Sequence, residues 1–269
     1  MSDLSWQLIV EPEPLPGPWN MAVDEHLFNL AATFPRTFLR FYRWERPTAS
    51  LGYGQDAAKV VDAAFCRDRG IDIVRRLTGG KLVLHDREVT YAVASADVSV
   101  FTETLRDSYR LISRALLAGL SLMGLSARLA ETSPQGYAKG TMPCFAFPAR
   151  DEIEIEGRKI VGSAQKRTGP LFLQHGSIPL EKDETLLAAV ARPGESPEGQ
   201  GMTSLSEALG RPMAFEEAVG PLVQGFADFF GVRFARFALG PADRQAIRAI
   251  QAAKYASDAW TFRERLAGR

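Results

Sequence analysis

The densest group of residues that could carry chemistry is a basic segment interrupted by two glycines. It reads Arg75-Arg76-Leu77-Thr78-Gly79-Gly80-Lys81. Paired glycines let a ligand approach the backbone closely because no Cβ intervenes, and the flanking cations would supply positive charge beside it. The G-x-x-x-x-G-K spacing of a nucleotide-binding P-loop is absent. A tight hairpin with solvated charges would show the same pattern, so both interpretations stay open here.

A second candidate is a lysine two residues after a predicted hairpin turn at Gly157. It opens the segment Lys159-Ile160-Val161-Gly162-Ser163-Ala164-Gln165. If the Lys159 side chain points inward with Val161 and Ser163, its amine leaves solvent and could hold an acyl carbonyl or move a proton. A lysine on an exposed strand edge, which discourages aggregation, would give the same sequence.

The third candidate is a cysteine in a Gly/Pro-rich stretch, Met142-Pro143-Cys144-Phe145. Loops carry function more often than framework elements do, and a thiolate is a strong nucleophile that forms thioesters. Cys144 therefore suits acyl transfer, although a buried structural cysteine is an alternative interpretation. For Cys66, on a predicted helix near Phe65, the structural interpretation is favoured.

The three histidines indicate no metal site. His26, His85 and His175 lack the spacing to a cysteine or a second histidine that metal ligands show. His85 could brace a loop by pairing with Asp86, and His175 lies on a predicted strand, where a neutral hydrogen-bonded role is expected. No G-x-S-x-G sequence is present, which argues against an α/β-hydrolase.

Composition excludes several classes of protein. The chain has 269 residues, 46% hydrophobic and 24% charged, which is typical of a globular protein and not of a disordered one. Its 32 basic and 32 acidic residues cancel, which argues against a broadly basic nucleic-acid binder. No apolar run approaches the ~20 residues of a membrane span, and the first residues show no secretion signal. Two cysteines fit a reducing cytoplasm.

The elements that must position these residues are helices and strands interleaved along the chain. Apolar spacing predicts helices over 20–30 (capped by Asn20), 57–69, 102–123, 184–191, 215–230 and 241–255. Strands are predicted over 37–42, 49–53, 71–74, 82–84, 90–94, 152–156, 159–164 and 171–175, the last three as an antiparallel meander. This order predicts an α+β fold. We expect one catalytic domain over 1–269, in which residues after about 181 form helical additions.

Taken together, these segments resemble the biotin/lipoate protein ligase superfamily, on its lipoate and octanoate side. The resemblance covers most of the chain and rests on motifs in the family order: Asn20-Met21-Ala22-Val23-Asp24-Glu25, the segment 75–81 with His85-Asp86, the segment 157–165, and Gln174-His175-Gly176-Ser177. It implies mixed, largely antiparallel sheets with packed helices. The chain is most similar to octanoyltransferases of the LipM type, in which a cysteine lies upstream of the lysine motif, as Cys144 does.

The resemblance implies a reaction without a cofactor or metal. Octanoyl would pass from acyl carrier protein to Cys144, and then to a lysine of an E2 lipoyl domain or the glycine-cleavage H protein. Lys159 would activate the thiol, polarise the carbonyl or accept the amine's proton. The residues implied to bind substrate are Arg75, Arg76, Thr78, Gly79, Gly80, Lys81, His85, Gly162, Ser163, Ala164, His175 and Gly176. Apolar residues near Leu77, Val83 and Val161 would line an octanoyl slot.

Three other functions remain open from the sequence. An ATP-dependent lipoate or octanoate ligase would form an acyl-adenylate, although such ligases usually carry a third glycine where this chain has Lys81. An amidotransferase would move octanoyl between lipoyl domains, also through a cysteine. A non-catalytic module would only bind acylated carrier proteins.

Overall fold

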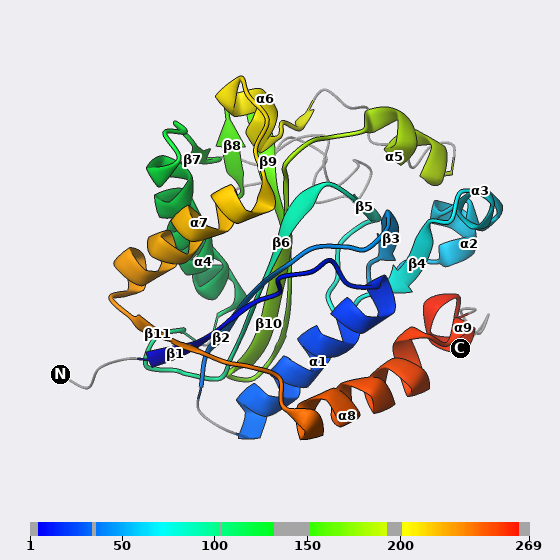
Figure 1. Ribbon diagram of the computed structural model, residues 1–269, viewed down its shortest axis with the longest axis horizontal. Coiled ribbons are helices and arrows are strands. Elements are labelled where there is room, and N and C mark those ends of the chain that lie inside the picture. The colour runs from blue at the N-terminus through cyan, green and yellow to red at the C-terminus, as the bar shows by residue number, and fades with distance from the viewer. Residues whose placement is uncertain (1–4, 34–35, 103, 132–150, 193–200, 264–269) are drawn as a thin grey trace.

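The computed structural model describes residues 5–33, 36–102, 104–131, 151–192 and 201–263, and its centre is a long mixed sheet (Figure 1). In order across the sheet, its strands are β11 (Arg233–Arg236), β1 (Ser5–Val10), β2 (Phe38–Tyr42), β6 (Glu88–Ser95), β10 (Leu171–Pro179), β9 (Arg158–Thr168), β8 (Ile153–Ile155) and β7 (Arg128–Leu129). The β11, β1 and β2 strands are parallel neighbours, and the other neighbours are antiparallel.

A smaller sheet lies beside the main one. It contains β4 (Asp72–Arg75), β3 (Thr48–Leu51) and β5 (Val83–His85), with β3 parallel to β4 and antiparallel to β5. The predicted mixed, largely antiparallel architecture is therefore confirmed. The predicted meander is also confirmed, as β8, β9 and β10.

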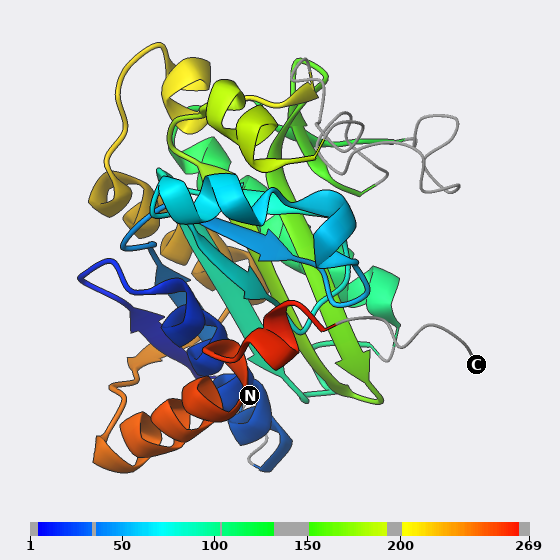
Figure 2. The same ribbon diagram turned by 90° about the vertical axis from the view of Figure 1, so that its right-hand side faces the viewer.

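Helices cover both faces of the main sheet (Figures 1 and 2). On one face α4 (Leu105–Leu122) and α7 (Phe215–Phe230) bury a large core that includes Phe41, Tyr91 and Phe226. On the other face α1 (Gly17–Thr33), α8 (Pro241–Ile250) and the π-helical turn η3 (Gln251–Tyr255) pack over Phe38 and Tyr42. Strand residues alternate between these two cores, as the twofold repeat of a strand requires.

Short helices complete the molecule. They are α2 (Ala57–Val60), α3 (Ala63–Asp68), α5 (Glu184–Val190), α6 (Leu205–Leu209) and α9 (Asp258–Thr261). The first three form a third core with the smaller sheet. Within the described ranges, no helix is both long and apolar enough to cross a bilayer.

Two predicted helix boundaries are wrong for identifiable reasons. The first helix begins at Gly17, not near Asn20, because Pro18 needs no amide partner in a first turn. The Asn20 side chain is buried inside α1, where it donates to the carbonyls of Leu15 (3.1 Å) and Arg43 (3.0 Å). The predicted helix over 57–69 divides into α2 and α3, because Asp62 caps a new helix by accepting from the Phe65 amide at 2.9 Å.

Three strands of the main sheet were not predicted: β1, β11 and the two-residue β7. The β1 strand pairs in parallel with β2 on one side and with β11 on the other. The β11 strand belongs to the segment expected to be helical, and most of its residues are exposed. It is a strand because β1 supplies a partner from the far end of the chain, a contact that no local pattern contains. The segment after residue 181 thus extends the main sheet.

Candidate active site

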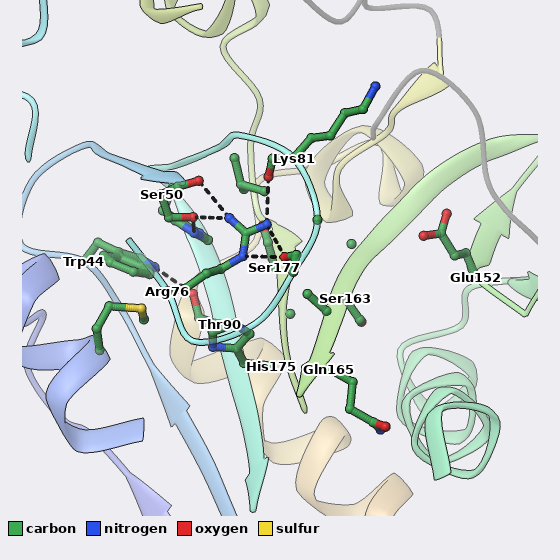
Figure 3. Close-up of a pocket in the computed structure, with 18 of the residues that line it drawn as sticks. Trp44, Ser50, Arg76, Lys81, Thr90, Glu152, Ser163, Gln165, His175 and Ser177 are labelled. Atoms are coloured by element: carbon green, nitrogen blue, oxygen red, sulfur yellow. Dashed lines mark hydrogen bonds between the residues drawn. The ribbon is translucent and has the colours of Figure 1, made fainter. Parts of the chain in front are cut away.

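The two sheets and the loop around Gly79 and Gly80 (residues 76–81, the glycine loop) enclose a pocket of about 190 Å³ (Figure 3). Its lining residues are Met21, Tyr42, Trp44, Ser50, Arg76, Gly79, Gly80, Lys81, Val83, His85, Thr90, Glu152, Lys159, Gly162, Ser163, Ala164, Gln165, His175, Gly176 and Ser177. The structure thus brings three distant motifs, around residues 80, 162 and 176, into one cavity. Of the sequence-predicted site residues, Arg75 and Thr78 lie outside the lining, and Cys144 lies outside the described residues.

The glycine loop is held from within by Arg76. Its guanidinium donates to the carbonyls of Ser50 (2.8 Å), Gly79 (2.8 Å) and Lys81 (2.7 Å), and the side chain is buried (Figure 3). Gly80 has φ +91°, and a Cβ there would lie 2.8 Å from Arg76 Nη2. The cation expected to meet substrate therefore shapes the loop, and its free approach to a ligand is limited by these carbonyl contacts.

Arg75, which was expected to bind substrate, lies outside the pocket lining. It is fully buried, and its guanidinium donates to the carbonyls of Gly52 (3.0 Å), Gln55 (2.6 Å) and Thr261 (2.8 Å). The Trp260 indole donates back to the Arg75 carbonyl at 2.8 Å. A guanidinium is a planar fork of five donors, and here it joins the C-terminal segment to the β3 loop. Arg75 thus has a structural role.

A buried chain of hydrogen bonds connects the loop to β6 through His85. Ser50 Oγ lies 2.7 Å from His85 Nε2, and His85 Nδ1 lies 2.8 Å from Glu88 Oε1. The Trp44 ring stacks on the imidazole with centroids 4.2 Å apart. The partner of His85 is therefore Glu88 and not Asp86. Burial raises the pKa of Glu88, but the charge and hydrogen bond of His85 and the bond from the Ser177 hydroxyl outweigh burial, so the pKa lies below its usual range.

A second chain of the same kind reaches the loop through His175. Thr78 Oγ1 lies 2.7 Å from His175 Nε2, and His175 Nδ1 lies 3.0 Å from Asp24 Oδ2. Burial lowers the pKa of His175 despite the Asp24 carboxylate. Burial alone would raise the pKa of Asp24, but the His175 hydrogen bond and the charge of Arg40 hold it below its usual range. Thr78 therefore anchors the loop from outside the pocket.

Of the two interpretations left open for Lys159, the inward-pointing one is confirmed and the exposed edge lysine is wrong. The side chain is 2% exposed, and its Nζ donates to Glu152 Oε1 at 2.8 Å. Both residues line the pocket, and Glu152 lies on the far side of β9 from Arg76 (Figure 3). The site therefore presents a buried lysine–carboxylate pair, which can polarise a carbonyl or take up a proton.

Sequence reasoning did not select Glu152, Ser50, Trp44 or Glu88 as site residues. Counting residues back from the turn at Gly157 could have placed a glutamate opposite Lys159, because Glu154 is the register partner of Lys159. Glu154 instead receives Arg128 at 2.7 Å, and a β-bulge between Ile153 and Glu154 shifts the register at this point.

The apolar part of the pocket also differs from expectation. Val83 lines it, whereas Leu77 and Val161 are buried in the cores and do not. Met21, Tyr42 and Trp44 supply the remaining apolar wall. These come from the first third of the chain and were not among the residues expected to bind substrate.

The two cysteines differ in what the structure describes of them. Cys66 is buried on α3, where burial raises the pKa of its thiol to about 11, so it suits the predicted structural role. Cys144 lies in the stretch outside the described residues. The chain on either side of that stretch is tied together, since the Asp151 amide donates to the Ala130 carbonyl at 3.0 Å. Among the described residues, no group of three or more His, Cys, Asp or Glu could hold a metal ion.

Comparisons with known proteins agree on one family. A family model described as the lipoyl protein ligase A/B catalytic domain matches residues 16–227. Octanoyltransferase LipM of Kyrpidia tusciae is 38% identical, covering 91% of this chain and 94% of that protein. The Brevibacillus brevis protein of the same name is 34% identical, covering 96% and 99%.

Solved structures show the same fold. A lipoate-protein ligase A bound with ATP superposes with a TM-score of 0.82 at 22% identity, covering 96% of this chain and 98% of that chain. A bi-partite lipoate protein ligase from Thermoplasma acidophilum, studied with its E2 lipoyl domain, gives a TM-score of 0.78 at 21% identity, covering 98% and 100%.

Proposed function

The chain belongs to the lipoyl protein ligase A/B catalytic domain family and is an octanoyltransferase of lipoate biosynthesis, and on this premise we propose that it acts through a thioester on Cys144. The donor is octanoyl-acyl carrier protein. The acceptor is a lysine of an E2 lipoyl domain or of the glycine-cleavage H protein. The observation that carries the proposal is the buried Lys159–Glu152 pair at the wall of the pocket.

The proposed reaction has two balanced steps. The Cys144 thiolate attacks the donor's thioester carbonyl, and the carrier leaves as its thiol after taking up a proton. The acceptor amine then attacks the octanoyl-enzyme thioester, an amide forms, the amine loses a proton, and the Cys144 thiol is restored. Exchange of one thioester for another is nearly isoenergetic and amide formation runs downhill, so neither step needs ATP.

Chain connectivity supports the pairing of the thiol with Lys159. Cys144 precedes Asp151 by seven residues, and a chain of that length spans at most about 25 Å. Glu152 follows directly, and its carboxylate accepts a hydrogen bond from Lys159 Nζ. A tether of that length allows the thiol to reach the lysine, which in the proposed reaction polarises the carbonyl or accepts a proton during attack.

The apolar wall of the pocket suits an acyl chain. Met21, Trp44 and Val83 lie beside the loop, and each methylene buried there contributes roughly 0.8 kcal/mol to binding. There is open space beside Gly79, since a Cβ at this position would meet nothing within 4 Å. The acyl chain can therefore pass close to the backbone here. We propose that the chain works as one catalytic domain in the cytoplasm.

Intact-mass analysis with octanoyl-acyl carrier protein, run with and without ATP, tests the proposal. The wild-type enzyme should gain one octanoyl mass without ATP, on Cys144. Cys144→Ala should stay unmodified, while Cys66→Ala, the matched control, should still be acylated. Lys159→Ala should slow acylation by about 10²–10⁴, the usual size for a lost acid–base group.

Several outcomes would refute the proposal. An unmodified wild-type enzyme that makes octanoyl-AMP from octanoate and ATP would be a ligase. Acylation only from an octanoylated lipoyl domain would make it an amidotransferase. Carrier binding without any transfer would leave it a binding module.

A further inference from the structure

The strand β9 presents to the pocket an edge that is open among the described strands, and we infer that this edge binds the phosphopantetheine arm of the donor as an added strand, with its phosphate at Lys166 and Arg263. The inference rests on the proposed function, which supplies a donor carried on that arm. It adds a binding site and a docking geometry that the reaction itself does not specify.

The first observation is that consecutive residues of one strand line the cavity. Gly162, Ser163, Ala164 and Gln165 all do so. Side chains alternate between the two faces of a strand, so four in succession line a cavity only where the strand's edge looks into it. β10 pairs with one edge of β9 from residue 162 to 168, whereas β8 pairs with the other edge only from 158 to 161. Among the described strands, none pairs with that second edge beyond Val161.

The register identifies the groups that this edge offers. β9 and β10 are joined by the two-residue turn Gly169-Pro170, so Thr168 and Leu171 form the closing hydrogen-bonded pair. Alternation along the ladder then directs the backbone groups of Ser163 and Gln165 away from β10, toward the open edge. Their side chains are engaged elsewhere, since Ser163 Oγ lies 2.7 Å from Tyr91 Oη and Gln165 Nε2 lies 3.0 Å from Gln174 Oε1. The edge therefore offers backbone N–H and C=O groups.

An extended chain with its own amides satisfies such an edge, which is how peptides add to sheets. The phosphopantetheine arm contains two secondary amides, and its β-alanine unit carries an N–H and a C=O that can pair with one strand residue. A peptide from the acceptor has amides too. The charges at the end of the edge favour the arm.

Two cations gather where β9 leaves the pocket. Lys166 follows Gln165, and its Nζ lies 5.8 Å from the Tyr53 ring. The Arg263 guanidinium lies 4.1 Å from the same ring and donates to the Tyr53 carbonyl. Tyr53 is 45% exposed and is joined to the glycine loop through its amide, which donates to the Thr78 carbonyl at 2.8 Å. A phosphate pairs well with lysine and arginine donors, and a neutral peptide would leave both unmatched.

The span along the strand restricts the shape of a bound arm. Seven residues separate Lys159 from Lys166, which at ~3.3 Å per residue is about 23 Å. An arm with its thioester near Lys159 and its phosphate near Lys166 must be extended, and extension is the conformation that strand addition needs.

Defined donors test the inference on the wild-type enzyme. Acylation rates are measured by intact mass with octanoyl-phosphopantetheine, octanoyl-pantetheine, and octanoyl-phosphopantetheine methylated on the β-alanine amide nitrogen. Methylation removes one donor and should slow acylation about tenfold, near the upper size of one hydrogen bond. Loss of the phosphate should slow the wild type about tenfold but should barely affect Lys166→Ala/Arg263→Ala. Lys59→Ala, an exposed lysine on α2, is the matched control and should behave as wild type.

Each contrary result has a distinct meaning. Equal rates for the methylated and parent donors would overturn strand addition. A phosphate effect that is unchanged in Lys166→Ala/Arg263→Ala would overturn the cation site. If that variant slows only transfer from octanoyl-enzyme to the lipoyl domain, the edge belongs to the acceptor and the inference fails. Should the variant not fold, the donor series on wild type still decides strand addition, while failure of the proposed function would leave every donor unreactive.

Discussion

Two histidines illustrate how single residues support the loop beside the pocket. His85 connects Glu88 to Ser50, and His175 connects Asp24 to Thr78. Each imidazole is buried, with a carboxylate on one nitrogen and a hydroxyl on the other. Such satisfied chains rigidify a site, because any broken link leaves a buried polar group without its partner.

Burial of His175 should make the free energy of unfolding depend on pH. Burial holds the pKa of folded His175 below its unfolded value of 6.5, so between these values the unfolded chain binds an additional proton. Stability from this residue is complete above pH 6.5 and falls as the pH drops below it, by at most about 1.4 kcal/mol per pH unit. Asp24 adds a second loss below its unfolded pKa of 3.8, because its folded pKa is lowered.

Urea unfolding at pH 7.5, 6.5 and 5.5 measures this dependence. His175→Gln cannot titrate and should show a shallower slope than the wild type over the same interval. His26→Gln is the control, since its partner Asp243 lies near the surface. Equal slopes for wild type and His175→Gln would contradict the assignment.

The two glycines of the glycine loop differ in whether the backbone needs a residue without a side chain. Gly80 has φ +91° and no room for a Cβ beside Arg76, whereas Gly79 has neither constraint. Folding therefore requires a glycine at position 80 but not at position 79, where we propose that the absent side chain makes room for the acyl chain.

This contrast predicts opposite effects from the same substitution. Gly80→Ala should lower the free energy of unfolding by about 1–3 kcal/mol through backbone strain. Gly79→Ala should leave stability nearly unchanged but raise KM for the octanoyl donor, because its methyl group would enter the pocket. Thermal unfolding and donor kinetics on both variants check this. A stable, fully active Gly79→Ala enzyme would mean that no ligand passes at this point.

The α4–α7 pair depends on a close backbone contact. A Cβ at Gly225 would lie 2.2 Å from the Gly119 amide nitrogen, whereas one at Gly220, also on α7, would meet nothing within 4 Å. Gly225→Ala should therefore destabilise the protein by about 1–3 kcal/mol through overpacking. Gly220→Ala should stabilise it by up to ~1 kcal/mol, because alanine is the better helix former. Equal effects on the unfolding midpoint would show that the helices do not touch there.

Across the whole molecule, Arg75 holds the C-terminal end of the described chain against the loop that follows β3. It connects β4 to the β3 loop at Gly52 and to Thr261 near the C-terminal end of the described chain. Arg75→Lys cannot reproduce the fork and should leave carbonyls unsatisfied, at roughly 1–3 kcal/mol each. We expect faster amide exchange over 258–263, with the central strands unchanged. Arg69→Lys, exposed at the end of α3, is the control, and equal exchange in the two variants would contradict this closure.

Much of the framework follows from local patterns in the sequence. Twofold alternation indicated β8, β9 and β10, and the apolar stripe indicated α4, because both patterns depend on near neighbours along the chain. The motifs also indicated most of the pocket lining, including an inward Lys159. Each of these is a local property, since a strand or helix repeats its buried face every few residues.

Which polar groups meet depends on how distant segments cross in the fold. In the fold, Lys159 pairs with the carboxylate of Glu152 and His85 with that of Glu88. Arg75 is buried against backbone carbonyls from distant segments. The fold also makes β11 a strand by placing β1 beside it. The physical reason is the same in each case. A buried charge or an unpaired strand needs a hydrogen-bonding partner, and the available partner is the group that the fold brings within about 3 Å. Spacing along the sequence does not show which distant segments come together.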